Sequence, residues 1–304
     1  MLNRMARRIL VTGYSGRLGN LVATHLRDAH ALNPRVLVRP ARLAGDWQPP
    51  FGMDVAAGDY ADPDSLQDAL AGIDAVFLVS PVDPEMCTHE LALAQAAARM
   101  PQPPHIVKVS GLGTRLDSFI DSGRWHAQIE QGIRKLGLPA TFLRPNFFMQ
   151  NLAFQADSIR LDGILRGAVA DARIAMVDAR DIAEVAAIAL LGGSAIEGKA
   201  VTLTSERNYN YEEIASALGC AFARPVTYKR QTAAEAATAL AQSGQPDWHV
   251  KILLAFNEAF IQGWGVEVTQ VVGSVLSCPP RTLESYLAEL AAGATVSGSD
   301  PFPS

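Results

Sequence analysis

The sequence predicts a doubly wound α/β fold, in which a parallel β-sheet carries helices on both faces and a smaller, mainly helical lobe follows. Two observations lead to this fold class. Short runs rich in Val, Ile and Leu recur without strict alternation, as is typical of strands buried on both faces. Stretches with helical spacing of apolar residues separate these runs, which indicates βαβ units.

Six runs in the first half of the chain carry the strand signal. They are RILVTG at 8–13, RVLVRP at 35–40, DVAAGD at 54–59, DAVFLVS at 74–80, HIVKVS at 105–110 and ATFLRP at 140–145.

Helix signals lie between these runs. After the first, Leu18, Val22 and Leu26 stand four residues apart and predict one apolar stripe on the sheet. In DPDSLQDALAG, Asp62 can accept hydrogen bonds from the first free amides, and Gly72 can close the helix in the left-handed conformation.

The regular alternation of strand and helix signals ends after residue 150. A short strand is expected to enter a helix at Asp178, GKAVTLTS predicts another strand, and Asn210 with Glu213 forms a capping-box pattern. From 232 onward the pattern is mainly helical. We therefore expect a nucleotide-binding domain at 6–205, with 150–173 contributing to the substrate cleft, a helical substrate lobe at 206–292 that packs over the sheet's binding edge, and a tail at 293–304.

Composition narrows the function classes. The 304 residues have a net charge of −5, and the 26 Lys and Arg residues are scattered, so no direct nucleic-acid partner is expected. Cys87, Cys220 and Cys278 lack metal-ligand spacing, which favours buried, inert thiols, no metal site and a reducing compartment. No run approaches the roughly 20 apolar residues of a membrane span, so a soluble cytoplasmic protein without a membrane partner is predicted.

The segment TGYSGRLG carries the strongest motif. Gly13, Gly16 and Gly19 follow a predicted strand and open an amphipathic helix, so a dinucleotide's phosphates can approach the free helix amides closely. Arg17 can add its charge to this phosphate site, and Ser15 and Leu18 complete the loop. The alternative is a tight turn without a ligand.

Arg39 ends the second predicted strand, about 20 residues beyond the last glycine of the motif. An acidic residue at this place would bind a free ribose 2′-hydroxyl, whereas Arg39 and the nearby Arg42 suit a 2′-phosphate. NADP(H) is therefore favoured over NAD(H). The alternative is that Arg39 is a solvated charge.

These segments resemble the NmrA-like branch of the atypical short-chain dehydrogenases/reductases from about Arg7 to Leu290. The phrase GLPATFLRPNFFMQNL is the most specific part. The resemblance implies a Rossmann fold, and its relatives include quinone and azo-dye reductases and nucleotide-binding regulators. It implies further cofactor contacts at each end of the dinucleotide. Asp59 and Tyr60 would lie near adenine, and Ser80 and Pro81 beside the adenine ribose. Ser110 and Gly111 would follow the fifth strand, and the residues beneath the nicotinamide would be Pro145, Asn146, Phe147 and Phe148.

The Tyr and Lys pair of the wider dehydrogenase family is missing, because no tyrosine in this chain has Lys four residues later. His126 stands where that Lys would fall, and Glu130, one helical turn on, shares a helix face with it and can orient the ring or hold its proton. His126 can donate a proton, contact the cofactor ribose or support it structurally, or lie on the surface; the three alternatives stay open.

The leading hypothesis is an NADPH-dependent oxidoreductase that passes hydride to a small apolar electrophile such as a quinone or azo compound. A catalytically silent NADP(H)-sensing regulator is the second, and isomerase, epimerase or lyase chemistry the third. A homodimer is the default assembly. Several aromatic residues can line an apolar cleft or pack in the core, namely Phe147, Phe148, Trp248, Phe256, Phe260 and Trp264.

Overall fold

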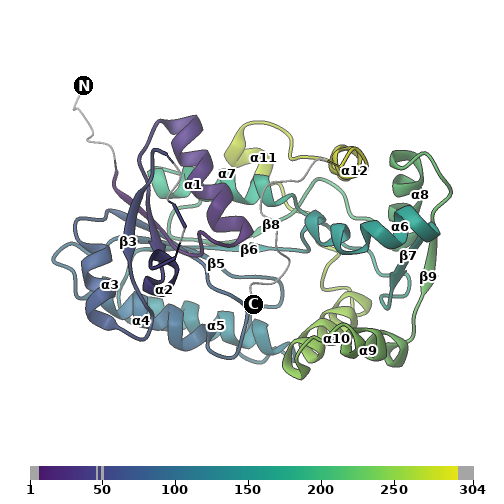
Figure 1. The fold of residues 1–304 in the computed structure, drawn as a ribbon, viewed down its shortest axis with the longest axis horizontal. Coiled ribbons are helices and arrows are strands. Elements are labelled where there is room, and N and C mark those ends of the chain that lie inside the picture. Colours follow the sequence, from purple (N-terminus) through teal and green to yellow (C-terminus); the bar gives the residue numbers. More distant parts are fainter. Residues whose placement is uncertain (1–6, 46, 49–50, 294–304) are drawn as a thin grey trace.

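A seven-stranded parallel sheet organises the protein. The structure, a computed structural model, describes residues 7–45, 47–48 and 51–293. The strand order is β3-β2-β1-β4-β5-β6-β8, which confirms the doubly wound α/β prediction (Figure 1). The strands are β1 (Ile9–Val11), β2 (Arg35–Val38), β3 (Asp54–Ala57), β4 (Ala75–Leu78), β5 (His105–Val109), β6 (Ala140–Pro145) and β8 (Ala200–Leu203).

Helices cover both faces of this sheet (Figure 1). Alternate residues of a strand point to opposite faces, so Val11 of β1 packs in one apolar cluster and Leu10 in another. The Val11 side is covered by α1 (Arg17–His30), α7 (Ala179–Leu191) and α11 (Val271–Leu276), and the Leu10 side by α3 (Pro63–Leu70), α4 (Met86–Ala98) and α5 (Asp121–Lys135). A short helix, α2 (Pro40–Leu43), follows β2 directly.

The predicted helix caps are confirmed. The Asp62 side chain accepts hydrogen bonds from the amides of Asp64 and Ser65, and Gly72 has a φ of +69°. Asn210 and Glu213 form a capping box at the start of α8 (Tyr211–Ala221). Local hydrogen bonding suffices to begin these helices, so the sequence alone locates them.

The segment before Asp178 differs from the prediction. Asp178 caps α7 as expected, but Ile174 and Val177 make only isolated bridges to Tyr209 and Phe148. No strand continues there, because the bridges lead to two different segments of the chain. Residues 173–177 therefore form a connection and not the predicted strand.

Beyond the main sheet, the molecule contains a second, two-stranded sheet that the sequence does not predict. The strands β7 (Ile164–Gly167) and β9 (Thr227–Arg230) pair in parallel. They include glycine and charged residues, so neither has the apolar signal of the main strands. The domain boundary near 205 stays a prediction; β7 and β9 lie on opposite sides of it.

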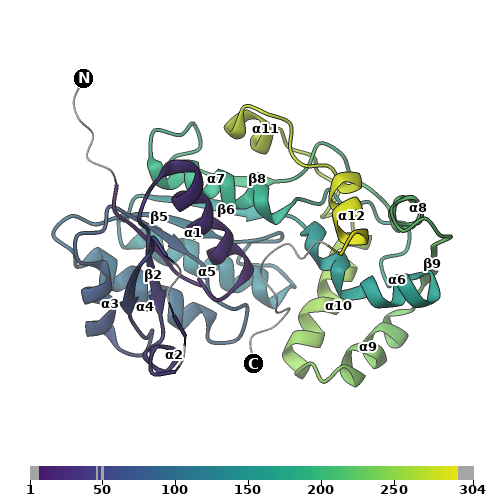
Figure 2. The same cartoon turned by 45° about the horizontal axis from the view of Figure 1, so that its top comes forward.

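Helices surround this small sheet (Figures 1 and 2). An apolar cluster that includes Leu165, Leu218 and Leu287 unites it with the neighbouring helices. The elements here are a 3-10 helix η1 (Met149–Gln155), α6 (Ala156–Asp162), α8, α9 (Ala233–Gln242), α10 (Asp247–Ile261) and α12 (Leu283–Ala291). None of the helices in the described ranges is both long and apolar enough to span a membrane. The predicted tail beyond residue 293 lies outside the described residues.

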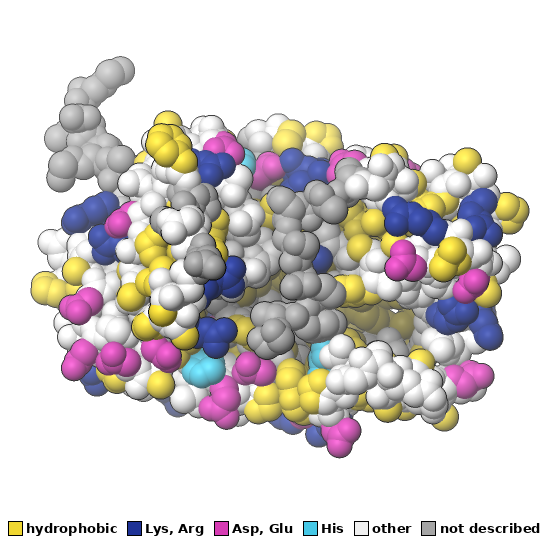
Figure 3. Space-filling model, in the orientation of Figure 1, with side chains coloured by type: hydrophobic (Ala, Val, Ile, Leu, Met, Phe, Trp, Pro, Cys, Tyr) yellow, Lys and Arg dark blue, Asp and Glu magenta, His cyan; other side chains and the backbone are white. Residues whose placement is uncertain are grey.

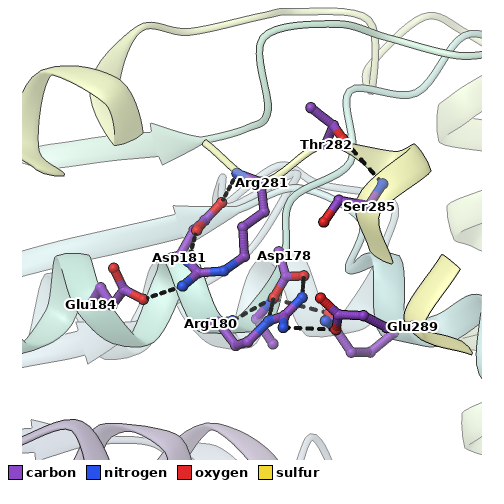
Figure 4. Close-up of polar contacts among 10 residues, drawn as sticks. Asp178, Arg180, Asp181, Glu184, Arg281, Thr282, Ser285 and Glu289 are labelled. Atoms are coloured by element: carbon purple, nitrogen blue, oxygen red, sulfur yellow. Dashed lines mark hydrogen bonds and ion pairs between the residues drawn. The ribbon is translucent and has the colours of Figure 1, made fainter. Parts of the chain in front are cut away.

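Two arginines tie the C-terminal segment to the start of α7 (Figure 4). Arg281 forms ion pairs with Asp181 and with Glu184, the latter at 2.6 Å. Arg180 binds Asp178 and also Glu289 of α12, each at 2.8 Å. Asp178 and Asp181 are buried, so these charge-assisted bonds also satisfy carboxylates that would otherwise be costly to bury.

Candidate cofactor and active site

The glycine turn forms the first part of the site. Gly13 has a φ of +62°, a conformation that side chains disfavour, and its carbonyl accepts a hydrogen bond from the Gly16 amide at 2.9 Å. A Cβ at Gly19 would lie 2.3 Å from the Gly13 oxygen. The turn therefore requires glycine, and it leaves the first amides of α1 without a side-chain cap. Such a helix start fits a pyrophosphate.

Arg17 is the first residue of α1, and its buried Nε has no hydrogen-bond partner among the described residues. An orphaned guanidinium nitrogen beside a free helix start is a second feature that fits an anionic group. The predicted loop residues differ in exposure, because Ser15 is exposed while Leu18 is buried in the core under α1. Leu18 can thus meet a ligand only through its backbone.

Arg39, Arg42 and Asp59 line one cavity of about 620 Å³ beyond β2 and β3. Both arginines are exposed. Arg42 lies 5.7 Å from the Trp47 ring centroid. Asp59 accepts a hydrogen bond from the Ala61 amide at 2.9 Å, which fixes its carboxylate at the cavity rim. The cavity therefore offers two cations for a phosphate and one carboxylate for a hydroxyl or amine.

Tyr60 follows Asp59 in the chain, and packing holds its side chain. Its ring stacks on His89 with centroids 5.1 Å apart. Burial, followed by the charge of Glu90, raises the pKa of the Tyr60 hydroxyl. Tyr60 is therefore a neutral phenol near neutral pH.

Two predicted serines turn their hydroxyls inward. After β4, Ser80 donates to Glu90 at 3.0 Å, and after β5, Ser110 donates to Glu130 at 2.8 Å. Pro81, next to Ser80, is exposed, and Gly111, next to Ser110, is half-buried. At both strand ends the serine hydroxyl is therefore bound to a buried carboxylate.

His126 is buried, 8% exposed, which contradicts the surface alternative. The expected pairing with Glu130 is also wrong. His126 Nδ1 lies 3.2 Å from the Lys108 ammonium, whereas Glu130 binds Arg144 at 2.6 Å and Arg134 at 3.0 Å. Spacing along a helix makes contact possible, but guanidinium groups compete better for a carboxylate than a neutral imidazole does.

Burial and the charges on the neighbouring strands set the protonation states of His126 and Glu130. Burial, then the Lys108 ammonium and the Arg144 guanidinium, lower the pKa of His126 well below its usual range. For Glu130, burial pushes the pKa upward, but Arg144 and Ser110 outweigh it and hold the pKa below its ordinary value. His126 is therefore a neutral imidazole, and Glu130 is an ionised carboxylate.

The segment after β6 connects the sheet to the second part of the molecule. Pro145 and Asn146 are buried, and the Asn146 side-chain amide donates to the Gly265 carbonyl at 2.9 Å. Phe147 and Phe148 are half-buried. Asn146 thus acts as a structural link, and the two phenylalanines form the apolar part of this strand end.

Aromatic side chains continue from here toward α10. Phe147 contacts Phe260 edge-on with centroids 5.8 Å apart, and Phe119 lies 4.7 Å from Trp264. Phe260 is a core residue, 3% exposed, whereas Phe119 is 39% exposed. Figure 3 shows hydrophobic side chains at the floor of a recess between α6 and α10. Of the six predicted aromatic residues only Phe260 is buried in the core, and the other five are half-buried and pack against the apolar clusters.

Other sequence predictions concern cysteine and metal ligands. Cys220 and Cys278 are exposed and Cys87 is half-buried, so the expectation of three buried thiols is wrong. No group of three His, Cys, Asp or Glu side chains with metal-binding geometry occurs in the described ranges. Lys108 and Glu90, which no sequence motif singles out, form a buried ion pair of 2.7 Å next to His126.

The fold and this edge of the sheet define a Rossmann-type dinucleotide protein with no tyrosine–lysine pair. A sequence profile of the NmrA-like family matches residues 5–287. The chain belongs to the NmrA-like family, which confirms the resemblance.

Two relatives are equally similar in sequence. The NAD(P)H azoreductase of Xenophilus azovorans is 34% identical over 91% of this chain and 96% of its own. The (4-alkanoyl-5-oxo-2,5-dihydrofuran-3-yl)methyl phosphate reductase of Streptomyces griseus is 34% identical over 92% of this chain and 97% of its own.

A solved structure extends the similarity to three dimensions. The NADPH-dependent quinone oxidoreductase of Escherichia coli in complex with NADPH matches with a TM-score of 0.81 and 25% identity, over 93% of this chain and 99% of the other.

Proposed function

We propose that this protein is an NADPH-dependent reductase that acts on a small, planar, apolar electrophile such as a quinone or an azo compound. The arrangement at the carboxyl edge of the sheet carries the proposal: a glycine turn open to phosphate follows β1, two cations follow β2 on one side of it, and one buried imidazole lies beside β5 on the other side. Bound NADPH would supply the hydride.

The residues divide the work along this edge. The turn from Gly13 to Gly19, with Ser15, Arg17 and the Leu18 backbone, would hold the pyrophosphate, and Arg39 with Arg42 the 2′-phosphate. The further contacts inferred from the family are Asp59, Tyr60, Ser80, Pro81, Ser110, Gly111, Pro145, Asn146, Phe147 and Phe148.

His126 would lie closest to the chemistry. A neutral imidazole can donate one hydrogen bond to the ribose or to the acceptor, but it does not supply the proton of an imidazolium. Quinones and azo compounds need little acid assistance, whereas an unactivated ketone needs more. The neutral state of His126 therefore favours acceptors of the first kind.

The relatives support a reductase over a regulator. Both proteins that share 34% identity with this chain are reductases, and one is named for azo reduction. A silent NADP(H) sensor is not favoured. The free cysteines support a cytoplasmic location, and the scattered charge supports the absence of a direct nucleic-acid partner. The reductase relatives support a small-molecule substrate, and a homodimer is the default assembly.

Stopped-flow fluorescence of enzyme-bound NADPH mixed with a simple quinone or an azo dye tests this function. Oxidation of bound NADPH that depends on the acceptor concentration is the expected result. Tight NADPH binding without oxidation by either acceptor class would contradict the proposal and reinstate the sensor.

A further inference from the structure

A buried row of polar side chains runs beneath the binding edge. It begins at Ser80 after β4, passes through Glu90 of α4 and Lys108 of β5, and ends at His126 of α5. Lys108 has no exposed surface and Glu90 is 1% exposed. Buried charges persist only where partners satisfy them, so the partners of Lys108 determine what this row does.

Three acceptors surround the Lys108 ammonium. They are the Glu90 carboxylate at 2.7 Å, the Val109 carbonyl at 2.6 Å and His126 Nδ1 at 3.2 Å. An ammonium has three protons and no lone pair, so it can only donate. His126 Nδ1 must then be the acceptor, which leaves the single proton of the neutral ring on Nε2.

The Nε2 side of the His126 ring faces the carboxyl ends of the strands, where the cofactor is expected to bind. His126 Nε2 and Cδ2 both lie 3.6 Å from where a Cβ at Gly111 would stand, directly after β5. Gly111 has no side chain to cover this edge of the imidazole. The Nε2 proton is therefore presented where the loop after β5 meets the expected cofactor.

The charges around His126 oppose a second proton on the ring. Lys108 faces it from β5 and Arg144 from β6, and both lower its pKa together with burial. Glu130 on the same helix is occupied by Arg144, Arg134 and Ser110, and Glu90 of α4 by Lys108 and Ser80. No free carboxylate among the described residues near the ring favours the imidazolium.

We propose that Lys108 is a positioning residue that holds His126 as the neutral Nε2–H tautomer, so that His126 serves hydride transfer as a fixed hydrogen-bond donor and not as an acid. The kinetic part rests on the proposed function. When the acceptor takes the hydride from NADPH, leaving NADP⁺, the further proton of the reduced product comes from water, because the neutral ring keeps its own.

The tautomer can be measured without turnover. Long-range ¹H–¹⁵N correlation spectra of the protein labelled with ¹⁵N-histidine distinguish a bare Nδ1 from a protonated one, and His126→Gln assigns the signal. We expect a bare Nδ1 and a protonated Nε2 from about pH 5.5 to about pH 8. A proton on Nδ1, or titration of the ring within this range, would refute the proposal without any Lys108 variant.

The variant Lys108→Met/Glu90→Gln removes both charges together, so that neither is left buried alone. His126 should then show mixed tautomers or begin to titrate, whereas Lys135→Met, on the exposed side of α5, should leave the spectrum unchanged. An unchanged His126 signal in the folded double variant would mean that Lys108 does not set the tautomer.

Single-turnover oxidation of bound NADPH by a quinone adds the functional reading. Its rate in the parent should not change with pH across the same range. In the double variant it should fall roughly tenfold and become pH-dependent, while NADPH affinity stays within about twofold. An unchanged rate and pH profile would refute the positioning role. If the parent protein shows the fixed His126 tautomer but oxidises no NADPH, the proposed reductase function is contradicted, while the role of Lys108 in setting the tautomer is not.

Discussion

Replacing Arg39 by Gln removes one of the two cations that line the cavity beside Asp59. The change keeps a polar side chain of similar length at the start of α2, where Arg39 makes no side-chain cap. Stability should therefore change little, and the effect should appear in nucleotide binding. The 2′-phosphate distinguishes NADPH from NADH, so the two nucleotides provide an internal comparison.

The size of the effect follows from the exposure of Arg39. A hydrogen bond to a charged group contributes about 1.5 to 3 kcal/mol, and solvent screening puts an exposed guanidinium at the lower end. About 1.5 kcal/mol corresponds to a roughly tenfold weaker NADPH affinity. Arg42 continues to line the cavity, so the loss should stop there, and NADH affinity should stay within about twofold.

Fluorescence titration with NADPH and NADH at one fixed ionic strength measures both affinities. Arg99→Gln, the same substitution at an exposed residue beyond the end of α4, controls for the change in net charge. Equal losses for the two nucleotides, or an equal loss in the Arg99 variant, would refute the assignment of Arg39 to the 2′-phosphate.

Two further predictions concern the turn and the buried carboxylate. Gly19→Ala would push a methyl group to 2.3 Å from the Gly13 oxygen, so NADPH binding should be lost and the melting temperature should fall. Gly273→Ala, where the added methyl group would make only ordinary contacts in α11, should change NADPH binding and melting temperature little. Calorimetry measures the melting temperature, and nucleotide titration measures the binding. The pKa of Glu130 in the folded protein lies below its ordinary value of 4.5. In the pH range between these two pKa values the unfolded chain binds more protons than the folded protein, so the free energy of unfolding should fall as the pH drops through this range. Glu130→Gln should flatten this acid dependence in urea unfolding series, while Glu85→Gln at an exposed residue should not; equal slopes in parent and Glu130 variant would contradict the reasoning.

The main sheet could be predicted because its central strands are buried on both faces, and because α3 and α7 begin with side-chain caps that can be recognised locally. Strand β7 and strand β9 could not, since a small two-stranded sheet needs no long apolar run, and TYKR at 227–230 has none. The same limit applies to Cys220 and Cys278. Their spacing indicates that they bind no metal, but exposure depends on how α8 and the turn after α11 pack.

His126 illustrates where site prediction fails. The spacing of four residues to Glu130 is a local property, whereas Arg144 and Lys108 reach the two side chains from neighbouring strands. One signal was present in the sequence, a lysine inside the apolar run HIVKVS. It predicts a buried partner, but identifying Glu90 requires knowing that α4 and α5 cover the same face of the sheet.

The parallel pairing of β7 with β9 makes the second part of the molecule discontinuous along the chain. Its sheet takes one strand from 164–167 and the other from 227–230, with α7 and β8 of the main sheet in between. A chimera that borrowed only the C-terminal segment of a relative would join a foreign β9 to a native β7. Evolution of new substrate preferences in this architecture therefore requires matched changes in two separate stretches of sequence, which favours gradual point substitution over exchange of a single block.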